Sequence, residues 1–376
     1  MSLVRKLAFR NLFHDRLRLV ATVIGIVFSI VLVTVQMGLY LGFGHMVATM
    51  IDNADADLWI MPKGTKCFED PSLLDERKRF RAKSIDGVAD ATPIVIGFAD
   101  WRTPSGTSTP VFVVGSNLKT GLRPWNLVEG QIAALSIPSA VAVDQSYFDR
   151  LGVKGIGSTA EIRQQKVRIA AVTSGIRSFT TTPYVFTTTE RARQYAGIPE
   201  GKATYFLVHL SKGADANATR QRLLANLDDI EVLTPTEFRN RSQSFWLFDT
   251  GAGMALFAGA VLGIIVGTVI VAQTLYSSTK DHLEEFATLR AIGSSAKYIY
   301  EVIIWQALIS AVIGFCLAAL IGGMIVKLTE GGALPIMMTP LLTLGLFVLT
   351  VTMCVASAIA AIVKVMRVDP AIVFSR

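Results

Sequence analysis

Four long apolar runs set the organisation of this chain. They cover residues 19–40, 251–276, 298–326 and 341–363. Each is longer than the roughly 20 apolar residues that cross a bilayer as a helix. The first run continues as a semi-apolar stretch to residue 51, which predicts a stalk beyond the membrane. The pattern therefore predicts a membrane α-helical protein with four transmembrane helices.

The segment between the first two runs, residues 52–235, has the pattern of a large aqueous α+β domain. Short runs of β-branched and aromatic residues, bounded by Gly, Pro, Ser and Asp, predict strands, and polar periodic stretches predict helices. The predicted strands are 57–62, 92–100, 110–115, 140–144, 167–173, 184–188, 205–210 and 230–234, and the predicted helices are 145–151, 190–196 and 216–227, with Thr189 as the N-cap of the second helix. A helix over 236–248 leads into the second run, so residues 236–276 are expected to form a second stalk and span.

Residues 1–18 combine five basic residues with a partial apolar stripe. This pattern is typical of an amphipathic helix lying on an anionic membrane leaflet. The alternative is the basic start of a cleaved signal peptide. The following run is about 22 residues long and has no A-x-A cleavage site, so we favour a retained anchor.

Residues 277–297 form a polar loop between the second and third runs. Apolar positions recur at Leu283, Phe286 and Leu289 with Arg290, up to a helix stop at Gly293. The loop is therefore expected to hold a short helix on the membrane surface, with Phe286 and Leu289 available to a partner. The alternative is an interfacial helix that contacts only lipid.

Basic residues predict the orientation of the spans. They are concentrated in the N-terminal segment, in the loop 277–297 and in the tail 364–376, whereas the short loop 327–340 holds only Lys327. By the positive-inside rule, both termini and the loop 277–297 are cytoplasmic, and residues 52–235 lie outside. The net charge of +7 therefore does not indicate nucleic-acid binding, because much of the excess flanks the spans. A mean hydropathy of +0.47 also fits a membrane protein with one large aqueous domain.

Small residues recur every four positions along the second and third runs. Such faces let helix backbones approach closely in lipid, which predicts helix packing within the chain or across a dimer. The residues are Gly251, Ala255, Gly259, Gly263 and Gly267 in the second run, and Ser310, Gly314, Ala318 and Gly322 in the third.

The sequence holds no P-loop, no nucleophile elbow and no metal-ligand spacing, so we expect no catalytic, cofactor or metal site on this chain. The three cysteines and four histidines are scattered. The inner parts of the spans carry no charged residue, and their main polar residues are Gln36, Gln273 and Gln306. Ion-coupled carriers place ionisable groups at membrane depth, so this absence disfavours a secondary transporter or channel. A transport function would then need energy from a partner.

Two segments resemble the FtsX/MacB family of ABC transporter permeases. In the loop, Glu285, Ala287, Leu289-Arg290-Ala291 and Gly293 are similar to the family's cytoplasmic loop motif. Near the N-terminus, the similar residues are Ala8, Arg10-Asn11-Leu12, Arg18, Thr22 and Gly25-Ile26, and in the tail they are Asp369-Pro370-Ala371. The chain departs from the family at residues 281–284, where basic residues are usual, and at Val373-Phe374, where Ala-Leu is usual.

The resemblance, closest to DevC-like exporter permeases, implies a fold, a function and partners. It implies a porter-like subdomain from about 52–100 with 200–235 and a β-rich insert over 101–199. It also implies that the loop docks on a cytoplasmic ABC ATPase dimer, which would hold ATP and Mg. The implied docking residues are Leu283, Glu284, Glu285, Phe286, Leu289, Arg290 and Gly293.

The implied protein is a non-catalytic homodimeric permease in the bacterial plasma (inner) membrane. ATP hydrolysis on the partner would move the outer domains and drive export of a lipid, glycolipid or other hydrophobic cargo, with a periplasmic adaptor and an outer-membrane channel as further partners. Two alternatives stay open. One is an FtsX-like signalling subunit that activates a cell-wall hydrolase, and the other is a lipoprotein-extraction permease.

Overall fold

The computed structural model describes residues 3–70, 72–104, 106–281, 296–329 and 336–366. The chain divides into two compact units, each of which is described by itself. The first comprises residues 1–42, 254–330 and 335–376, and the second comprises residues 43–253 with 331–334.

The first unit is helical. Its elements are α1 (Leu3–His14), the first part of α2 (Arg16–Asp52), most of α8 (Ala252–Asp281), α10 (Ala296–Thr329) and α11 (Pro340–Met366). Four helices among the described residues are long and apolar enough to cross a membrane: Arg16–Asp52, Ala252–Asp281, Tyr300–Thr329 and Pro340–Val363. These correspond to the four apolar runs of the sequence.

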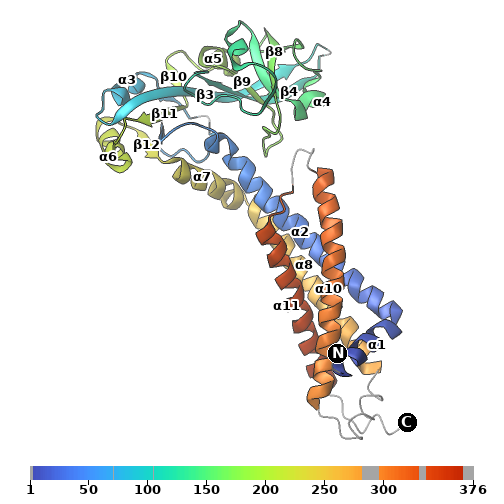
Figure 1. Cartoon of the computed structure of the whole chain (residues 1–376). Coiled ribbons are helices and arrows are strands. Elements are labelled where there is room, and N and C mark those ends of the chain that lie inside the picture. Colours follow the sequence, from blue (N-terminus) through green and yellow to red (C-terminus); the bar gives the residue numbers. More distant parts are fainter. Residues whose placement is uncertain (1–2, 71, 105, 282–295, 330–335, 367–376) are drawn as a thin grey trace. The chain divides into compact units, whose positions relative to one another are not determined.

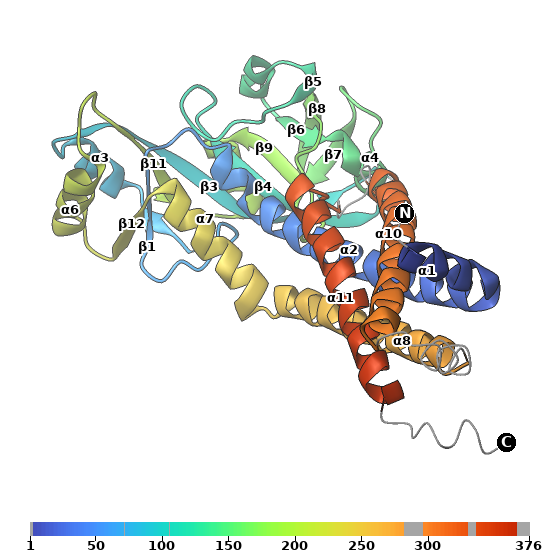
Figure 2. The same ribbon diagram turned by 60° about the horizontal axis from the view of Figure 1, so that its bottom comes forward.

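The core of the helical unit is built where α2, α8, α10 and α11 meet. Ile26 and Ile30 of α2 pack with Val271 and Leu275 of α8, and the other members are Ile303, Ala307, Ala311, Ala318, Met353, Cys354, Ala358 and Ala361. The views in Figures 1 and 2 both show α10 and α11 side by side. Large apolar residues on the outer faces of these helices are exposed, as expected for side chains that face lipid.

The second unit is built on a ten-stranded sheet with the order β12-β1-β11-β3-β4-β9-β6-β8-β5, and β7 pairs with β3 and β8. The strands are β1 (Leu58–Pro62), β3 (Val88–Arg102), β4 (Ser108–Ser116), β5 (Leu127–Gly130), β6 (Ala140–Asp144), β7 (Thr159–Ile162), β8 (Gln165–Thr173), β9 (Tyr184–Thr188), β11 (Tyr205–Leu210) and β12 (Ile230–Leu233). A separate two-stranded sheet pairs β2 (Leu74–Asp75) with β10 (Lys202–Ala203).

Both faces of the large sheet are buried. Leu58 and Ile60 of β1 belong to one core cluster, and Trp59 and Met61 belong to the other. Successive side chains of a strand point to opposite faces, so a continuous apolar run such as that of β1 is expected when both faces are covered. The helices of this unit are α3 (Arg77–Lys83), α4 (Phe148–Leu151), α5 (Thr189–Ala196), α6 (Ala216–Asn226) and α7 (Pro235–Ser244).

One long strand joins the two halves of this domain. The first part of β3 pairs with β11, from Val88 to Ile94, and the second part pairs with β4, from Val95 to Arg102. The porter-like half and the insert predicted from the resemblance thus share β3. The predicted division near residue 100 falls inside this strand.

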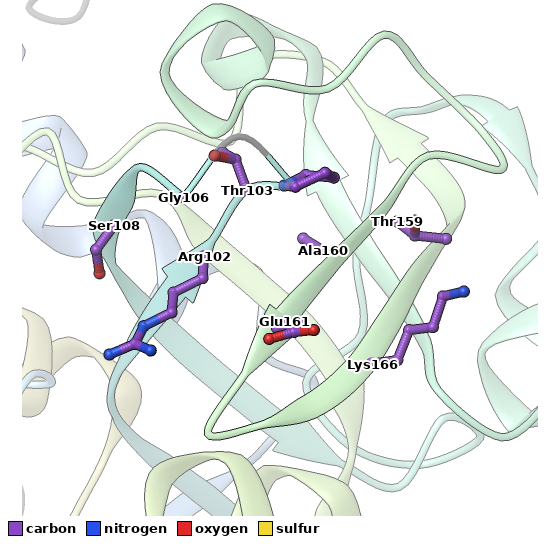
Figure 3. Close-up of a pocket in the computed structure, with 9 residues that line it drawn as sticks. Arg102, Thr103, Gly106, Ser108, Thr159, Ala160, Glu161 and Lys166 are labelled. Atoms are coloured by element: carbon purple, nitrogen blue, oxygen red, sulfur yellow. The ribbon is translucent and has the colours of Figure 1, made fainter.

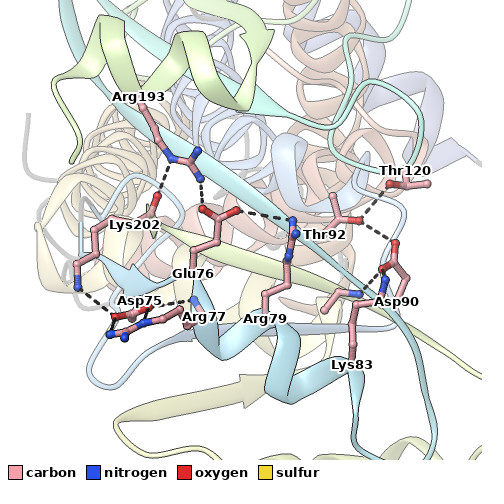
Figure 4. A network of polar contacts seen from close by, with 11 residues as sticks. Asp75, Glu76, Arg77, Arg79, Lys83, Asp90, Thr92, Thr120, Arg193 and Lys202 are labelled. Carbon is pink, nitrogen blue, oxygen red and sulfur yellow. Dashed lines mark hydrogen bonds and ion pairs between the residues drawn. The ribbon is translucent and has the colours of Figure 1, made fainter. Parts of the chain in front are cut away.

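A polar network also ties elements from the two halves together (Figure 4). The carboxylate of Glu76, just before α3, accepts a 2.5 Å hydrogen bond from Arg193 of α5 and lies 3.7 Å from Arg79. Arg193 also donates to the carbonyl oxygen of Lys202, 3.0 Å away. These contacts fix α3, α5 and β10 to one another.

The predicted strands 140–144, 184–188 and 205–210 coincide with β6, β9 and β11, and the other predicted strands agree within a few residues. Four short strands were not predicted: β2, β5, β7 and β10. The predicted N-cap of α5 is wrong by one residue. Thr188, in extended conformation, is the N-cap, and Thr189 is the first helical residue.

The predicted helix over 236–248 consists of two parts. Helix α7 begins with a capping box, in which the Thr234 hydroxyl accepts from the Glu237 amide and the Glu237 carboxylate accepts from the Thr234 amide. A π-helical turn, η3 (Phe245–Asp249), follows. The helix is then interrupted at Gly251, whose φ of +78° lies in the left-handed region that favours glycine.

Candidate functional site

The candidate site of the helical unit lies where α1, α2 and α8 meet, beside the end of α8. Helix α1 ends at His14, and α2 begins at Arg16 after a bend at Asp15. The Asp15 carboxylate accepts a hydrogen bond from the Arg18 amide (3.3 Å), and the Asp15 carbonyl accepts from the Leu19 amide (3.1 Å). A short acidic side chain at a helix N-terminus satisfies amides that have no intrahelical partner. Asp15 therefore caps the start of α2 at the bend that separates it from α1.

Arg18 connects this bend to the end of α8. Its guanidinium pairs with Asp281, the last residue of α8, and also lies 3.0 Å from the Asp15 carboxylate. A third contact, of 3.4 Å, reaches the carbonyl oxygen of Ser277. One side chain thus holds the start of α2 against the last turn of α8, immediately before the loop expected to bind a partner.

Helix α1 also packs against α10. The Arg5 guanidinium lies over the Trp305 ring, 4.3 Å from its centroid, in a cation–π arrangement. Ala8 is fully buried, whereas Phe9 and Phe13 are exposed and stack on each other with ring centroids 4.3 Å apart. The apolar residues of α1 are therefore divided between a face on α10 and an exposed face that carries Phe9 and Phe13.

A small polar cavity lies beneath α1. It is lined by Asn11, Leu12, Asp15, Arg18, Leu19, Thr22, Thr274, Leu275, Ser278 and Gln306. Gln306 of α10, predicted as one of the main polar residues of the spans, is buried here. The Thr22 hydroxyl donates to the Arg18 carbonyl over 2.8 Å. Several residues of the N-terminal family pattern therefore meet α8 and α10 at one place.

The residues predicted to dock on an ATPase, Leu283, Glu284, Glu285, Phe286, Leu289, Arg290 and Gly293, lie outside the described residues. Their role stays a prediction. The structure describes instead the helix ends that carry them, namely α8 up to Asp281 and α10 from Ala296.

The small residues predicted for helix packing lie against α2 from two sides. On α8, a Cβ added to Gly259 would lie 2.8 Å from Gln36, one on Gly263 would lie 3.2 Å from Leu32 and Val33, and one on Gly267 would lie 2.2 Å from the Ser29 hydroxyl. The Ser29 hydroxyl donates to the Gly263 carbonyl, 2.7 Å away. Two members lie elsewhere: Gly251 precedes α8, and Ala255 is exposed.

The same arrangement occurs on α10. A Cβ on Gly314 would lie 2.5 Å from Ile26 Cγ2, and one on Gly322 would lie 3.3 Å from Thr34. Ser310 and Ala318 are fully buried on the same helix. Within the chain, α2 therefore receives the small faces of both α8 and α10.

The α+β domain carries an open polar cleft of about 600 Å³ between the ends of two hairpins (Figure 3). It is lined by Arg102, Thr103, Pro104, Gly106 and Ser108 near the β3–β4 turn, and by Thr159, Ala160, Glu161 and Lys166 of β7 and β8. The lining mixes positive and negative side chains. Among the described residues, no group of three or more His, Cys, Asp or Glu side chains could hold a metal ion.

This domain also holds a buried polar cluster around Glu69, which sequence reasoning did not identify. Glu69 lies in a polar, charged stretch of the sequence, but its carboxylate is buried and accepts hydrogen bonds from Tyr184 (3.3 Å) and Trp246 (3.2 Å). Burial raises the pKa of Glu69 to about 7 and that of the neighbouring Cys67 thiol to about 12. The only sequence signal was the apolar Cys67-Phe68 pair inside the charged stretch.

Four membrane-length helices and a large sheet domain inserted between the first two define a membrane protein with one aqueous α+β domain. Two family models match this architecture. The MacB-like periplasmic core domain matches residues 19–226, and the FtsX-like permease C-terminal matches residues 254–370. Because the first match covers more than half of the sequence, the chain belongs to the MacB/FtsX family of ABC transporter permeases.

Similar proteins in mycobacteria extend over the whole chain. An uncharacterized ABC transporter permease of Mycobacterium tuberculosis (strain ATCC 25618 / H37Rv) is 26% identical over 387 residues, covering 98% of each chain. Another, of Mycobacterium bovis (strain ATCC BAA-935 / AF2122/97), is 24% identical over 375 residues, again covering 98% of each chain. These relatives are named as permeases, and the family in general works with an ATPase partner.

Two solved structures are similar in part. The periplasmic region of MacB from Actinobacillus actinomycetemcomitans matches with a TM-score of 0.37 and 11% identity, covering 50% of this chain and 94% of that chain. The extracellular domain of the noncanonic ABC-type transporter YknZ from Gram-positive bacteria matches with a TM-score of 0.36 and 14% identity, covering 48% of this chain and 99% of that chain.

Proposed function

We propose that this chain is the non-catalytic permease subunit of an ABC exporter that works by mechanotransmission. In this mechanism a separate cytoplasmic ATPase hydrolyses ATP, and the permease transmits the resulting movement through its helices to an aqueous domain on the other side of the membrane. The cargo class we favour is a lipid, glycolipid or other hydrophobic molecule. ATP and Mg are held by the partner and not by this chain.

The orientation follows from the basic residues. Arg5, Lys6 and Arg10 of α1 and Lys280 at the end of α8 flank one end of the spans, which supports a cytoplasmic location for this end in the bacterial inner membrane. Both termini and the loop between α8 and α10 then face the ATPase, and the α+β domain faces the periplasm.

The observation that carries the proposal is the junction centred on Arg18. Force applied to the loop after Asp281 acts on the end of α8, and the Arg18–Asp281 pair passes it to the start of α2. Both α2 and α8 continue toward the α+β domain along the chain, so a movement of their cytoplasmic ends is directed into the segments on either side of that domain. Close backbone packing at Gly263 and Gly267 makes α2 and α8 move together.

The assembly we propose contains two copies of this chain and an ATPase dimer, with a periplasmic adaptor and an outer-membrane channel on the outer side. The test is reconstitution of the chain with its cognate ATPase in lipid, measuring ATP turnover and the release of labelled lipid in one preparation. ATP turnover that the permease stimulates, together with adaptor-dependent lipid release, is expected. Stimulated turnover without any release, accompanied by activation of a cell-wall hydrolase, would instead identify a signalling subunit.

A further inference from the structure

The segment after β1, residues 63–70, contains three consecutive buried side chains, those of Cys67, Phe68 and Glu69. Phe68 is fully buried and packs on Trp59 and Tyr205, with ring centroids 6.2 and 5.8 Å away. The Tyr205 hydroxyl lies 3.0 Å from the Cys67 carbonyl oxygen and 2.9 Å from that of Phe68. This anchoring places the next side chain, Glu69, in the interior, although it lies in a charged stretch of the sequence.

The Glu69 carboxylate joins three elements that are far apart in the sequence. One oxygen accepts from the Tyr184 hydroxyl on β9, and the other accepts from the Trp246 indole N–H on η3. Both donors are neutral groups. A buried carboxylate without charge compensation from its hydrogen-bond partners is disfavoured relative to its protonated form.

Trp246 lies in the π-helical turn η3, between the end of α7 and the interruption at Gly251. Its π-helical turn closes with a hydrogen bond from the Thr250 amide to the Phe245 carbonyl (3.1 Å), and Gly251 follows with positive φ. Such turns interrupt regular helix packing and are frequent at functional sites. The Trp246 ring also contacts Phe179, with centroids 4.5 Å apart, so the turn is held by this aromatic contact and by Glu69.

We propose that Glu69 is a protonation-dependent latch. With its carboxyl group protonated, Glu69 holds segment 63–70, β9 and the π-turn η3 together. Loss of the proton to water favours an open state in which the carboxylate faces solvent and the Trp246 indole is released. The latch therefore acts on the turn that connects α7 to α8, the chain segment through which this domain continues into the second span.

The energetic link follows from the chemistry of the carboxyl group. Burial raises the pKa of Glu69 to about 7, against the lowering effect of its hydrogen bonds, whereas a solvent-exposed carboxyl has the ordinary value of 4.5. The ratio of closed to open state would then fall by up to about 300-fold as pH rises through this interval. Other titratable groups facing Glu69 or its partners are Cys67, Asp70, Tyr205 and Tyr147. Burial raises the pKa values of the Cys67 thiol and of the tyrosine hydroxyls, so the thiol and the tyrosines are neutral at pH 7.

The test uses the full chain in lipid nanodiscs with 5-fluorotryptophan. The fluorine resonance of Trp246 is assigned by its loss in Trp246→Phe, and the other four tryptophans serve as internal references. We expect the Trp246 resonance to shift between pH 5 and 9 with a midpoint near 7. In Glu69→Gln, a neutral isostere, it should stay at the low-pH position of the wild type.

Two further variants make the result decisive. Tyr184→Phe removes a donor to the ionised carboxylate, so the midpoint should move to higher pH. Glu231→Gln changes a carboxylate of the same domain that pairs with Arg241, and should leave the midpoint unchanged. A Trp246 resonance that is constant with pH, or that titrates equally in wild type and Glu69→Gln, would overturn the latch. The experiment needs no ATPase, so its failure would leave the proposed export function untouched.

Discussion

Arg18 at the start of α2 and Asp281 at the end of α8 are paired although 263 positions separate them in the sequence. Both side chains are partly exposed, at 32% and 52%. Ion pairs of this kind add only about 0.2–1 kcal/mol to stability. The pair is therefore better suited to fix where the loop after α8 begins than to hold the membrane unit together.

A double-mutant cycle tests this role. Arg18→Gln and Asp281→Asn should each leave thermal stability within about 1 kcal/mol of wild type, but lower the ATP turnover that the permease stimulates in its partner. The double variant should be no worse than either single variant, because each single change already removes the same link. Lys280→Gln, an exposed neighbour, is the control. Additive losses of turnover in the double variant would show that the two residues act separately.

The glycines that face α2 have matched controls on the same helices. In Gly314→Ala on α10, the new Cβ would lie 2.5 Å from Ile26 Cγ2, whereas in Gly323→Ala nothing lies within 4 Å. Overpacking of this kind costs about 1–3 kcal/mol. We expect a lower apparent Tm in detergent for Gly314→Ala and Gly267→Ala, and wild-type behaviour for Gly323→Ala. Equal Tm values for the two α10 variants would show that α10 does not pack closely on α2 at Gly314.

The stability of the α+β domain should depend on pH through Glu69, and the sign follows from its pKa. The folded chain holds the Glu69 proton up to about pH 7 and the unfolded chain only up to about 4.5, so stability falls as pH rises from 4.5 to 7. The loss amounts to about 3 kcal/mol at most, an order-of-magnitude value. Glu69→Gln should therefore be more stable than wild type at pH 8 and similar to it at pH 5.

Glu231 provides a control of the opposite sign. Burial works against its ionisation, but hydrogen bonds from Arg241 and the Gly64 amide outweigh this and lower the pKa of Glu231. Its contribution to stability is present above the ordinary pKa and is lost as pH falls through the lowered value. Glu231→Gln should therefore destabilise the domain at pH 8. Thermal unfolding of the full chain at the two pH values distinguishes the two carboxylates.

The sequence predicted the elements whose burial is local and missed those that depend on distant partners. Strands β6, β9 and β11 are continuous apolar runs between turn residues, and the predicted bounds agree with the structure. Strand β7 has a mixed composition and was missed, because its pairing partners β3 and β8 supply its register. Likewise, the burial of Glu69 depends on Tyr184 and Trp246, which lie 115 and 177 positions away.

The candidate site was predicted only in part, again because its contacts join residues that are distant in the sequence. Arg18 was identified as one residue of a family pattern, but its position relative to Asp281 results from how α2 packs on α8. The small faces of α8 and α10 were predicted from their four-residue period, whereas a shorter run of the same kind on their common neighbour α2, Ala21, Gly25 and Ser29, was not identified. Periodicity identifies a face that packs, and only the structure identifies what it packs against.

The predicted orientation can be tested by cysteine labelling in intact cells. In a background with the three native cysteines removed, Ser108→Cys lies at an exposed position of the α+β domain, and Ser277→Cys lies at an exposed position near the end of α8. An impermeant maleimide should label the first and not the second, because the positive-inside rule predicts that the end of α8 is cytoplasmic. Labelling of Ser277→Cys before the membrane is permeabilised would reverse the orientation.

The last prediction concerns the loop between α8 and α10, which holds the predicted docking residues of the proposed coupling mechanism. Phe286 and Arg290 lie outside the described residues, so the prediction rests on the sequence pattern and on the helix ends that carry the loop. An interfacial helix resting only on lipid would tolerate Arg290→Glu. In a protein groove, the reversed charge loses its partner, which typically costs roughly 2–5 kcal/mol, and Phe286→Ala removes an apolar anchor worth about 2 kcal/mol or more.

Because the two effects should combine, Phe286→Ala/Arg290→Glu is expected to lose co-purification of the cognate ATPase and its stimulated turnover. The loop residues lie outside the four spans, so the variant should still insert into the membrane and keep its Tm. The change Ser108→Ala, in the α+β domain, is the control and should leave ATPase binding intact. Wild-type binding and turnover in the double variant would exclude these two residues from the contact with the ATPase. The contact would then have to use other residues at this end of the spans, either the remaining predicted loop residues or the basic residues of α1.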